Sequence, residues 1–319
     1  MTRHTPRELL DKGLISEDQF LKIDSIHAGK IVSVLYELRS LLYLGVLLFT
    51  TGAGLLIYEN IGEIGHLISI AALMILTLAC FWHAFKKTPA YSNETVKGPT
   101  PYFDYIVLLG SLLFISVLGY LQFQFGFLDD KLEYVTLITS LFFFFIAYRF
   151  DQLSVLSLAI TALASFWSIS ISPQKWYQGE FSTSSNLHIT AIVFSMALIS
   201  FALVLDKKSI KKHFTFTYLN FGSLIFFVGA ISGQFIGEWS MFYLLLIYGG
   251  CALAWIMARQ KKSFLFLLYA FVAAYIGTTY FLSTILNDFN EFWFYYSIVS
   301  CGGFIFFILR YRNYFNRAE

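Results

Sequence analysis

Residues 187–233 read LHITAIVFSMALISFALVLDKKSIKKHFTFTYLNFGSLIFFVGAISG. Two apolar runs in this stretch, residues 187–205 and 213–233, flank a short basic segment. Each run is about 20 residues long, the length that an α-helix needs to cross the hydrocarbon core of a bilayer. Backbone groups that face hydrocarbon must be hydrogen-bonded within their own segment, and the runs are too long and too uniformly apolar for barrel strands. The stretch therefore predicts two membrane-spanning helices joined by a basic loop.

The same pattern recurs along the whole chain. Ten spans are predicted, at residues 40–58, 64–84, 103–121, 132–148, 152–171, 187–205, 213–233, 239–258, 263–285 and 290–310. With 57% hydrophobic and 13% charged residues, the 319-residue chain has too little polar surface for a water-soluble domain. We expect an all-α, polytopic membrane helix bundle at residues 40–310, preceded by a polar head and linker at 1–39 and followed by a tail at 311–319.

The basic residues predict the orientation of this bundle. Of the 22 Lys and Arg residues, 20 fall in the head, the tail and every second loop, and only Lys131 and Lys175 fall on the other side. The positive-inside rule then places both termini in the cytoplasm. Because the basic residues lie at helix ends, the formal net charge of +2 does not indicate a nucleic-acid partner. The lipid bilayer is the partner that the composition requires.

The head carries two helix-start signals. Thr5, Pro6 and Glu8 form one capping sequence, and Ser16 with Gln19 forms the next. They predict a short cytoplasmic helical hairpin, which either packs on the membrane domain or docks a separate protein at residues 1–38. Residues 30–38 predict an amphipathic helix that either lies in the membrane interface or runs straight into the first span.

A family resemblance rests on the head and the first span. Gly13-Leu14-Ile15-Ser16, the acidic capped helix after it, and a glycine-bearing first span that ends in Gly54-Leu55-Leu56-Ile57-Tyr58-Glu59-Asn60 resemble the bacterial membrane-protein family called domain of unknown function 2157. Asn60 matches the family's asparagine, and Ile61 stands where its tryptophan is usual. The resemblance covers about residues 6–85. It implies a multi-pass protein of the bacterial cytoplasmic (inner) membrane and no established activity.

The turn between the first two spans holds the densest polar cluster. Glu59, Asn60, Glu63 and His66 fall within eight residues on the side opposite the basic loops. If a helix begins at residue 63, Glu63 and His66 share one face, a spacing that suits half of a metal site or a proton relay. The alternative is an ordinary solvated turn capped by Asn60. Without a further ligand we assign no metal, and no other cofactor is indicated.

The spans themselves contain few ionisable residues. Asp104, Asp151, Asp206 and His83 fall near span ends, where we expect water and lipid head groups to reach them. Asn220 and Gln234 are the polar residues that could line a substrate path, although an asparagine that bonds a neighbouring helix is the more common outcome. Small residues repeat every four positions at Gly229, Gly233 and Gly237, and again at Gly250, Ala254 and Ala258. They predict close helix packing, with a hinge or a break along a pathway as the alternative.

Three classes of function remain open. No phosphate loop, zinc-protease motif or nucleophile elbow is present in the sequence, so no catalytic residue is assigned. The leading hypothesis is a non-catalytic integral membrane protein whose cytoplasmic head and basic loops contact a partner or anionic lipid. The alternative is a small-solute carrier of the drug/metabolite-exporter type, with residues 40–171 and 187–310 as an inverted repeat. A membrane enzyme with an outer-face site is third. Nothing in the sequence indicates an oligomeric state.

Overall fold

The computed structural model describes residues 16–17, 20, 35–59, 63–96, 98–126, 128, 131–171, 187–236, 239–286 and 290–311. The chain divides into two compact units, Met1–Leu55 with Glu319, and Leu56–Ala318. In the first unit, the helix α3 (Leu35–Glu59) begins and continues past the boundary without a break. For residues 35–39, the linker therefore runs directly into the helix of the first predicted span.

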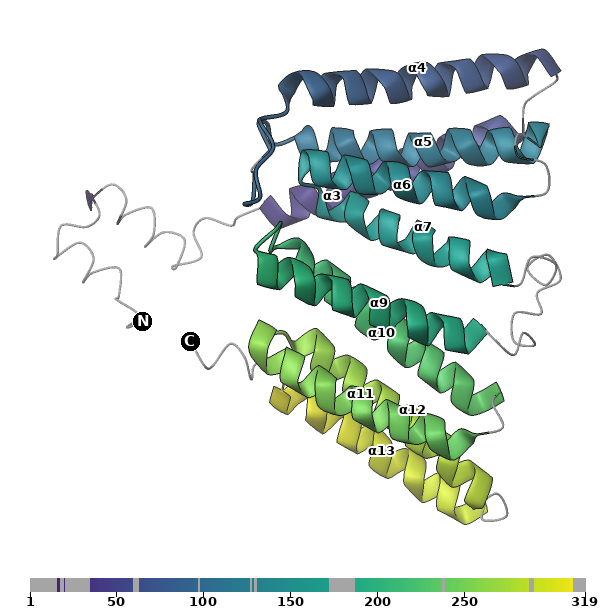
Figure 1. The fold of residues 1–319 in the computed structure, drawn as a ribbon, viewed down its shortest axis with the longest axis vertical. Helices are drawn as coiled ribbons and strands as arrows, with labels where there is room; N and C mark the ends of the chain where they lie inside the picture. The colour runs from purple at the N-terminus through teal and green to yellow at the C-terminus, as the bar shows by residue number, and fades with distance from the viewer. Residues whose placement is uncertain are drawn as a thin grey trace. The chain divides into compact units, whose positions relative to one another are not determined.

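The second unit is built from helices that follow one another along the chain, as Figure 1 shows. They are α4 (Glu63–Lys87), α5 (Phe103–Phe125), α6 (Leu132–Phe150), α7 (Leu153–Ile171), α9 (Leu187–Lys208), α10 (Phe214–Ile236), α11 (Ser240–Lys261), α12 (Phe264–Ile285) and α13 (Asn290–Tyr311). Their bounds lie within a few residues of the predicted spans. The all-α polytopic bundle is confirmed.

The predicted spans differ in the length of their apolar segments. Within the described residues, eight helices are long and apolar enough to cross a membrane, namely α4 to α7 and α9 to α12. The helices α3 and α13 contain shorter apolar segments, Ser40–Gly52 and Tyr295–Phe307. Helices of this kind expose apolar side chains around most of their surface, which only a lipid environment stabilises.

Successive helices pair as antiparallel hairpins. The closest pairs are α9 with α10, α6 with α7, α11 with α12, and α4 with α5. Left-handed residues end several helices, with Gly126 after α5 at a φ of 57°, Asp151 after α6 at 58° and Lys262 after α11 at 49°. A left-handed residue at this position returns its N–H to the last turn and reverses the chain. These caps explain why the connections are short.

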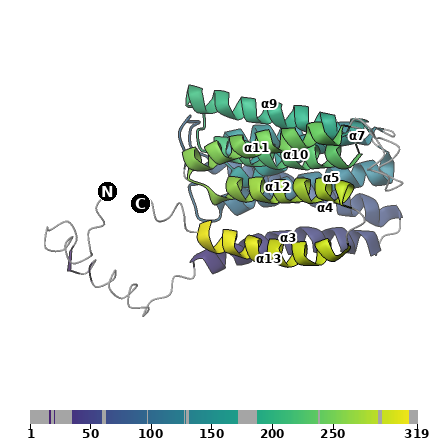
Figure 2. The ribbon, with the colours of Figure 1, turned by 90° about the horizontal axis from the view of Figure 1, so that it is seen from below.

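The helix α10 is the most buried of the eight. It packs on α7, α9, α11 and α12, and Figure 2 shows it between α9 and α12. Small residues make this possible: a Cβ at Gly222 would come within 2.7 Å of Ile199 Cγ1, and a Cβ at Gly229 within 3.0 Å of the Ala191 Cβ. A Cβ at Gly233 would overlap the ring of Tyr243. The predicted close packing at Gly229 and Gly233 is confirmed, while Gly237 lies outside the described residues.

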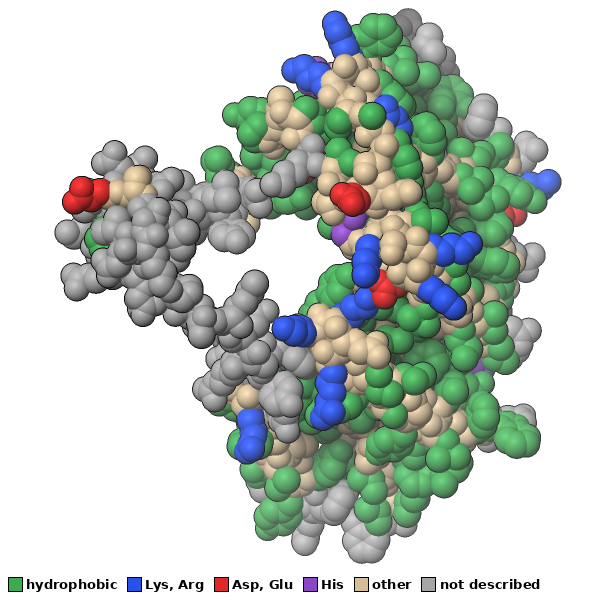
Figure 3. Space-filling model, turned by 60° about the vertical axis from the view of Figure 1, so that its left-hand side comes forward, with side chains coloured by type: hydrophobic (Ala, Val, Ile, Leu, Met, Phe, Trp, Pro, Cys, Tyr) green, Lys and Arg blue, Asp and Glu red, His purple; other side chains and the backbone are tan. Residues whose placement is uncertain are grey.

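The two ends of the second unit differ in charge. The helices α4, α6, α9 and α11 end, and α5, α7, α10 and α12 begin, at what we call the basic end, because the last turns there carry Lys86, Lys87, Arg149, Lys207, Lys208, Arg259 and Lys261. Figure 3 shows Lys and Arg side chains gathered on one side, with apolar side chains over the flanks. The other end of the same helices is called the opposite end.

Candidate functional site

An apolar groove runs along α9 between α6, α7 and α10. Its cavity volume is about 640 Å³, and its wall on α9 consists of Thr190, Val193, Phe194, Ala197, Leu198 and Phe201. These residues recur at intervals of three and four, so they share one face of the helix. Phe144 and Tyr148 of α6, Leu163 and Trp167 of α7, and Tyr218 of α10 form the rest of the wall. Val193, Phe201 and Trp167 are about half exposed, so the groove opens to the surface of the helices.

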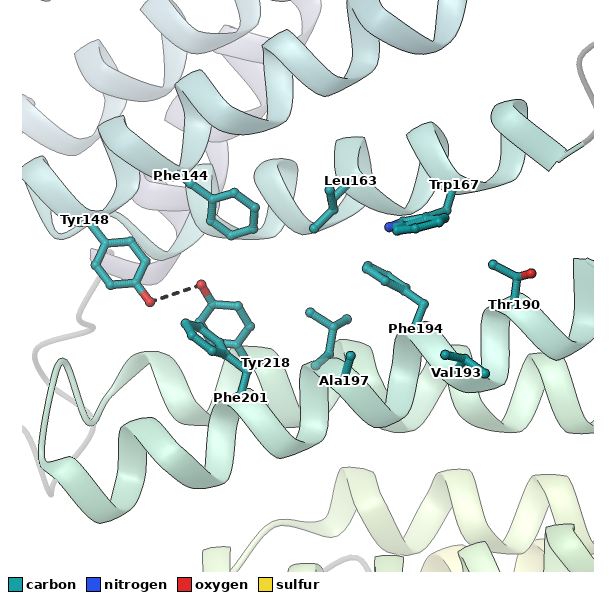
Figure 4. Close-up of a pocket in the computed structure, with 11 residues that line it drawn as sticks. Phe144, Tyr148, Leu163, Trp167, Thr190, Val193, Phe194, Ala197, Phe201 and Tyr218 are labelled. Atoms are coloured by element: carbon teal, nitrogen blue, oxygen red, sulfur yellow. Dashed lines mark hydrogen bonds between the residues drawn. The ribbon is translucent and has the colours of Figure 1, made fainter.

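The polar groups of this groove are few and lie at its two extremes. Figure 4 shows Tyr148 and Tyr218 at one extreme, with their hydroxyl oxygens 3.1 Å apart, and Trp167 with Thr190 at the other. Between Thr190 and Phe201, α9 rises about 16 Å, roughly half of a hydrocarbon core. Between these extremes the groove is lined by Phe144, Leu163, Val193, Phe194, Ala197, Leu198 and Phe201. A groove of this length and polarity suits an acyl chain or another slender apolar group.

A second cavity adjoins the groove toward the opposite end. Its volume is about 320 Å³, and it shares Trp167, Thr190 and Phe194 with the groove. His188, in the first turn of α9, lines this cavity and is only 6% exposed. The imidazole stands edge-on to Tyr243, with ring centroids 5.3 Å apart. Its Nδ1 is buried and has no hydrogen-bond partner within the described part of the chain.

At the basic end, the carboxylate of Asp151 joins three connections between helices. Asp151 Oδ1 lies 2.9 Å from Lys211 Nζ and 2.6 Å from His213 Nε2, and Oδ2 accepts the backbone N–H of Val96 at 2.6 Å. The side chains of Asp151 and Lys211 are only 3% and 1% exposed. We call Asp151, Lys211, His213, Thr95 and Val96 the Asp151 cluster. It ties the α4–α5 loop, the α6–α7 turn and the α9–α10 turn together.

The partners of Asp151 are themselves held in place. Thr95 Oγ1 lies 3.2 Å from His213 Nδ1, and the backbone N–H of Lys211 donates to the Asn93 carbonyl at 3.0 Å. The Lys211 ammonium lies 5.1 Å from the centroid of the Tyr91 ring, a cation–π arrangement. Because an ionised carboxylate can only accept, His213 Nε2 carries the hydrogen that it donates to Asp151. Both carboxylate oxygens are thus engaged, and the cluster has the geometry of a structural clamp.

The expectation that water reaches Asp151 at its span end is wrong, and Lys211 is buried with it. The loop that follows α4 covers the pair, because Val96 and Thr95 supply their hydrogen bonds and Tyr91 covers the ammonium. By contrast, Asp206 is 29% exposed and pairs with Lys261 of α11 at 3.0 Å. The loop after α4 is therefore the reason that Asp151 is shielded from solvent while Asp206 is partly exposed.

Asn220 and Gln234, the two predicted substrate-binding residues, both bond α12. Asn220 Oδ1 accepts the Tyr269 hydroxyl at 2.9 Å, and Gln234 Nε2 donates to the Gly277 carbonyl at 2.9 Å. Neither residue is part of the wall of the two cavities described above. Gln234 Oε1 is buried without a hydrogen-bond partner among the described residues. A Cβ at Gly277 would lie only 3.1 Å from this oxygen, so α10 and α12 are in close contact there. Side-chain bonds between helices are the arrangement expected of such residues in lipid.

The structure describes only part of the predicted polar cluster between the first two spans. Glu59 ends α3, and Glu63 and His66 lie in the first turn of α4, as expected of a helix that begins at residue 63. Asn60 lies outside the described residues. In the part of the chain that the structure describes, no three His, Cys, Asp or Glu side chains come together as a metal site. The groove and the Asp151 cluster, which sequence reasoning missed, are the sites with defined geometry.

Comparison with known proteins supports the class of the protein. No significant match exists among curated proteins or solved structures. A family described as "Predicted membrane protein (DUF2157)" matches residues 7–156, which extends well beyond the expected 6–85. Of the Asp151 cluster, the matched residues include Thr95, Val96 and Asp151, whereas Lys211 and His213 lie outside the match. Because eight helices among the described residues are suited to crossing a bilayer and residues 7–156 match this family, the protein is a multi-pass integral membrane protein that is similar over residues 7–156 to the DUF2157 family.

Proposed function

We propose that this membrane protein is non-catalytic and binds an anionic lipid of the cytoplasmic leaflet, with an acyl chain in the groove and the head group at the basic end. The observation that carries the proposal is the apolar groove of about 640 Å³ that opens toward the surface of the helices. In a bilayer this surface faces hydrocarbon, so a slender apolar chain is the occupant that the surroundings supply. The bonded tyrosine pair, Tyr148 and Tyr218, would mark the depth at which the polar part of the lipid begins.

The charge at the basic end of the groove argues for an anionic head group. Lys208 lies seven residues after Phe201, so it falls within about 20° of the same face of α9 and about 10 Å farther along its axis. Lys208 is exposed at the last residue of the helix, and Lys207 and Lys212 are exposed beside it. Each Lys near an anionic membrane surface contributes about 1 kcal/mol to binding. The apolar groove and Lys208 together complement an amphiphile with a negative head.

This proposal includes an orientation. The gathering of Lys and Arg residues in every second connection supports a cytoplasmic location for the basic end and for both termini, in a bacterial cytoplasmic membrane. In a variant without native cysteines, Lys212→Cys should be protected from a membrane-impermeant maleimide in intact cells. Trp239→Cys, at the opposite end, should be labelled. The reverse labelling pattern would contradict the proposed orientation, because it would place the basic end outside the cytoplasm.

Lipid retention by the purified protein tests the groove. Native mass spectrometry would compare the retention of phosphatidylglycerol and phosphatidylcholine by the wild type and by Ala197→Trp, which places an indole in the groove. We expect Ala197→Trp to lower the retention of both lipids about tenfold. Leu203→Trp, an exposed position of α9 outside the groove, is the matched control and should retain lipid as the wild type does. Equal retention by Ala197→Trp and the wild type would refute the groove as the lipid site.

The same assay tests the contact between Lys208 and the lipid head group. Lys208→Gln should reduce the preference for phosphatidylglycerol about fivefold, the equivalent of about 1 kcal/mol. Lys86→Gln removes the same charge at the basic end of α4, away from the groove, and should keep the preference. If both substitutions have the same effect, the preference reflects the overall charge of this end, and the role of Lys208 is refuted.

A carrier is the second candidate, and one observation favours it. The two cavities share Trp167, Thr190 and Phe194, so they lie next to each other along α7 and α9. A carrier in which the two cavities join into one route would move apolar solutes. Flux of such a solute into proteoliposomes, abolished by Ala197→Trp, would support it, while lipid retention without flux would support the binding function. The inverted repeat of residues 40–171 and 187–310 stays a prediction, to be tested by superposing the two halves.

A cytoplasmic protein partner for residues 1–38 also stays a prediction. Most of this segment lies outside the described residues. At the predicted second helix start, the Phe20 N–H donates to the Ser16 carbonyl at 2.9 Å, which is one helical turn. Pull-down experiments with the full chain and with a chain that lacks residues 1–38 would test the partner, and equal capture by both would refute it.

A further inference from the structure

The tyrosine pair of the groove has a hydrogen-bond donor to spare. Tyr148 and Tyr218 both line the groove, and Figure 4 shows their hydroxyl groups turned toward each other. Each hydroxyl has one hydrogen to donate, and the single bond of 3.1 Å between them uses one of the two hydrogens. Within the described residues, neither hydroxyl makes another hydrogen bond. One donor of the pair therefore remains available.

Burial indicates which hydroxyl keeps its hydrogen. Tyr218 is only 1% exposed, whereas Tyr148 is only partly buried. A buried donor without an acceptor lowers stability, so the arrangement of lower free energy has the Tyr218 hydroxyl donating to Tyr148. The hydrogen of the Tyr148 hydroxyl is then the free one, and it belongs to the more accessible side chain of the two.

Aromatic neighbours hold both rings of the pair in place. The Tyr148 ring stands edge-on to Phe214, with ring centroids 5.1 Å apart, and the Tyr218 ring stands edge-on to Phe201 at 5.2 Å. Phe144 lies nearly parallel to the Tyr218 ring, with centroids 6.5 Å apart. Because such rings lose little freedom on binding, the free hydroxyl hydrogen is pre-organised for an acceptor that enters the groove.

The depth of the pair matches the ester groups of a bilayer lipid. Tyr218 lies one turn after Phe214, the first residue of α10, so its backbone is about 6 Å from the basic end of this helix. Helical side chains lean toward the N-terminus of their helix, which for α10 is the basic end. The pair therefore lies near the boundary between hydrocarbon and head groups. An acyl chain starts at its ester carbonyl, so a chain in the groove would place this carbonyl beside Tyr148.

We infer that the Tyr148 hydroxyl donates a hydrogen bond to the ester carbonyl of the bound lipid, so that the groove selects ester-linked lipids over ether-linked ones. This inference rests on the lipid binding proposed above. An ether lipid lacks the carbonyl oxygen, although its chains and head group can be the same. A site that donates a hydrogen bond to a ligand group discriminates against an analogue without that group, because its donor is then left unpaired.

Two lipids that differ only in their linkage test the inference without any substitution. Native mass spectrometry would compare the retention of diacyl and dialkyl-ether phosphatidylglycerol, with chains of equal length, by the wild type. We expect the diacyl form to be retained about three- to tenfold more strongly, the worth of one hydrogen bond. Equal retention of the two forms would overturn this inference and leave the lipid proposal intact. If the wild type retains neither form, both are refuted.

Substitutions assign the selectivity to Tyr148. Tyr148→Phe should abolish the preference for the diacyl form, and Tyr218→Phe, which leaves the Tyr148 hydrogen in place, should reduce the preference less. Tyr269→Phe removes a hydroxyl that bonds Asn220 outside the groove, and it should keep the preference of the wild type. A merely structural effect of Tyr148→Phe would lower the retention of both forms alike and leave the preference unchanged, which would overturn the inference.

Discussion

A histidine lies near each end of the hairpin of α9 and α10, and the surroundings of the two histidines differ. At the basic end, His213 bonds Asp151 at 2.6 Å and approaches Thr95 at 3.2 Å, inside a cluster that joins three connections. At the opposite end, His188 is more deeply buried, yet its Nδ1 has no partner in the described residues and a cavity lies beside it. A satisfied polar network rigidifies a fold, whereas a buried polar atom without a partner lowers its stability. The contrast predicts that His213 contributes to the stability of the protein and that His188 does not.

The largest loss of stability is expected at Asp151. We expect Asp151→Ala to lower the free energy of unfolding by about 3–5 kcal/mol, because it leaves the Lys211 ammonium buried and unpaired. Unfolding by sodium dodecyl sulfate in bicelles would measure it. Asp206→Ala removes the more exposed pair with Lys261 and should cost less than about 1 kcal/mol.

A double variant separates charge burial from other effects at this site. If the loss comes from the unpaired ammonium, Asp151→Ala with Lys211→Met should be more stable than Asp151→Ala alone. Asp151 also has a φ of 58°, where alanine is strained, and that part of the loss would persist in the double variant. No recovery at all would mean that the ion pair is not the source of the stability.

Substitution of the two histidines is expected to have different effects on stability. His213→Phe should lower the free energy of unfolding by about 1.5–3 kcal/mol, since it removes a hydrogen bond to a charged group. His188→Phe should leave it unchanged or raise it by about 1 kcal/mol, because it removes a buried nitrogen without a partner. The same detergent titration measures both. A similar loss in both variants would contradict the expected difference between the two histidines.

A smaller effect than at Asp151 or His213 is expected at the tyrosine pair of the groove. Tyr148→Phe breaks the bond of 3.1 Å to the Tyr218 hydroxyl and should cost about 1 kcal/mol. Replacing both tyrosines by phenylalanine should cost less than the sum of the two single changes, because no hydroxyl is then left alone. A double-mutant cycle of unfolding free energies measures this coupling, and strict additivity would show that the two hydroxyls do not interact.

Much of the fold could be predicted because a membrane span is a local property. The segment 187–233 alone predicts α9, its basic connection and α10, and the helices begin and end within a few residues of the expected bounds. Close packing at Gly229 and Gly233 was also predictable, because a small residue every four positions is itself a local pattern. The number of spans was less certain, since α3 and α13 contain only shorter apolar segments within the described residues.

The sites could not be predicted in the same way. Asn220 and Gln234 were singled out because they are polar residues in spans, and both form hydrogen bonds to α12. The groove is lined mostly by apolar side chains, so the sequence does not distinguish its residues from those of any other apolar helix face. Asp151 and Lys211 are 60 positions apart, and their sequence neighbourhoods resemble other basic helix ends.

The sequence alone predicts a multi-pass membrane protein, the approximate bounds of its helices and the basic character of every second connection. These properties depend on residue type and spacing over 20 or so positions, which lipid and helix geometry translate directly into structure. Only the tertiary structure decided that Lys211 is buried against Asp151, that a groove remains between α6, α7, α9 and α10, and that His188 Nδ1 lacks a partner among the described residues. Such features arise where side chains from distant segments meet, and neither composition nor periodicity records which segments will do so.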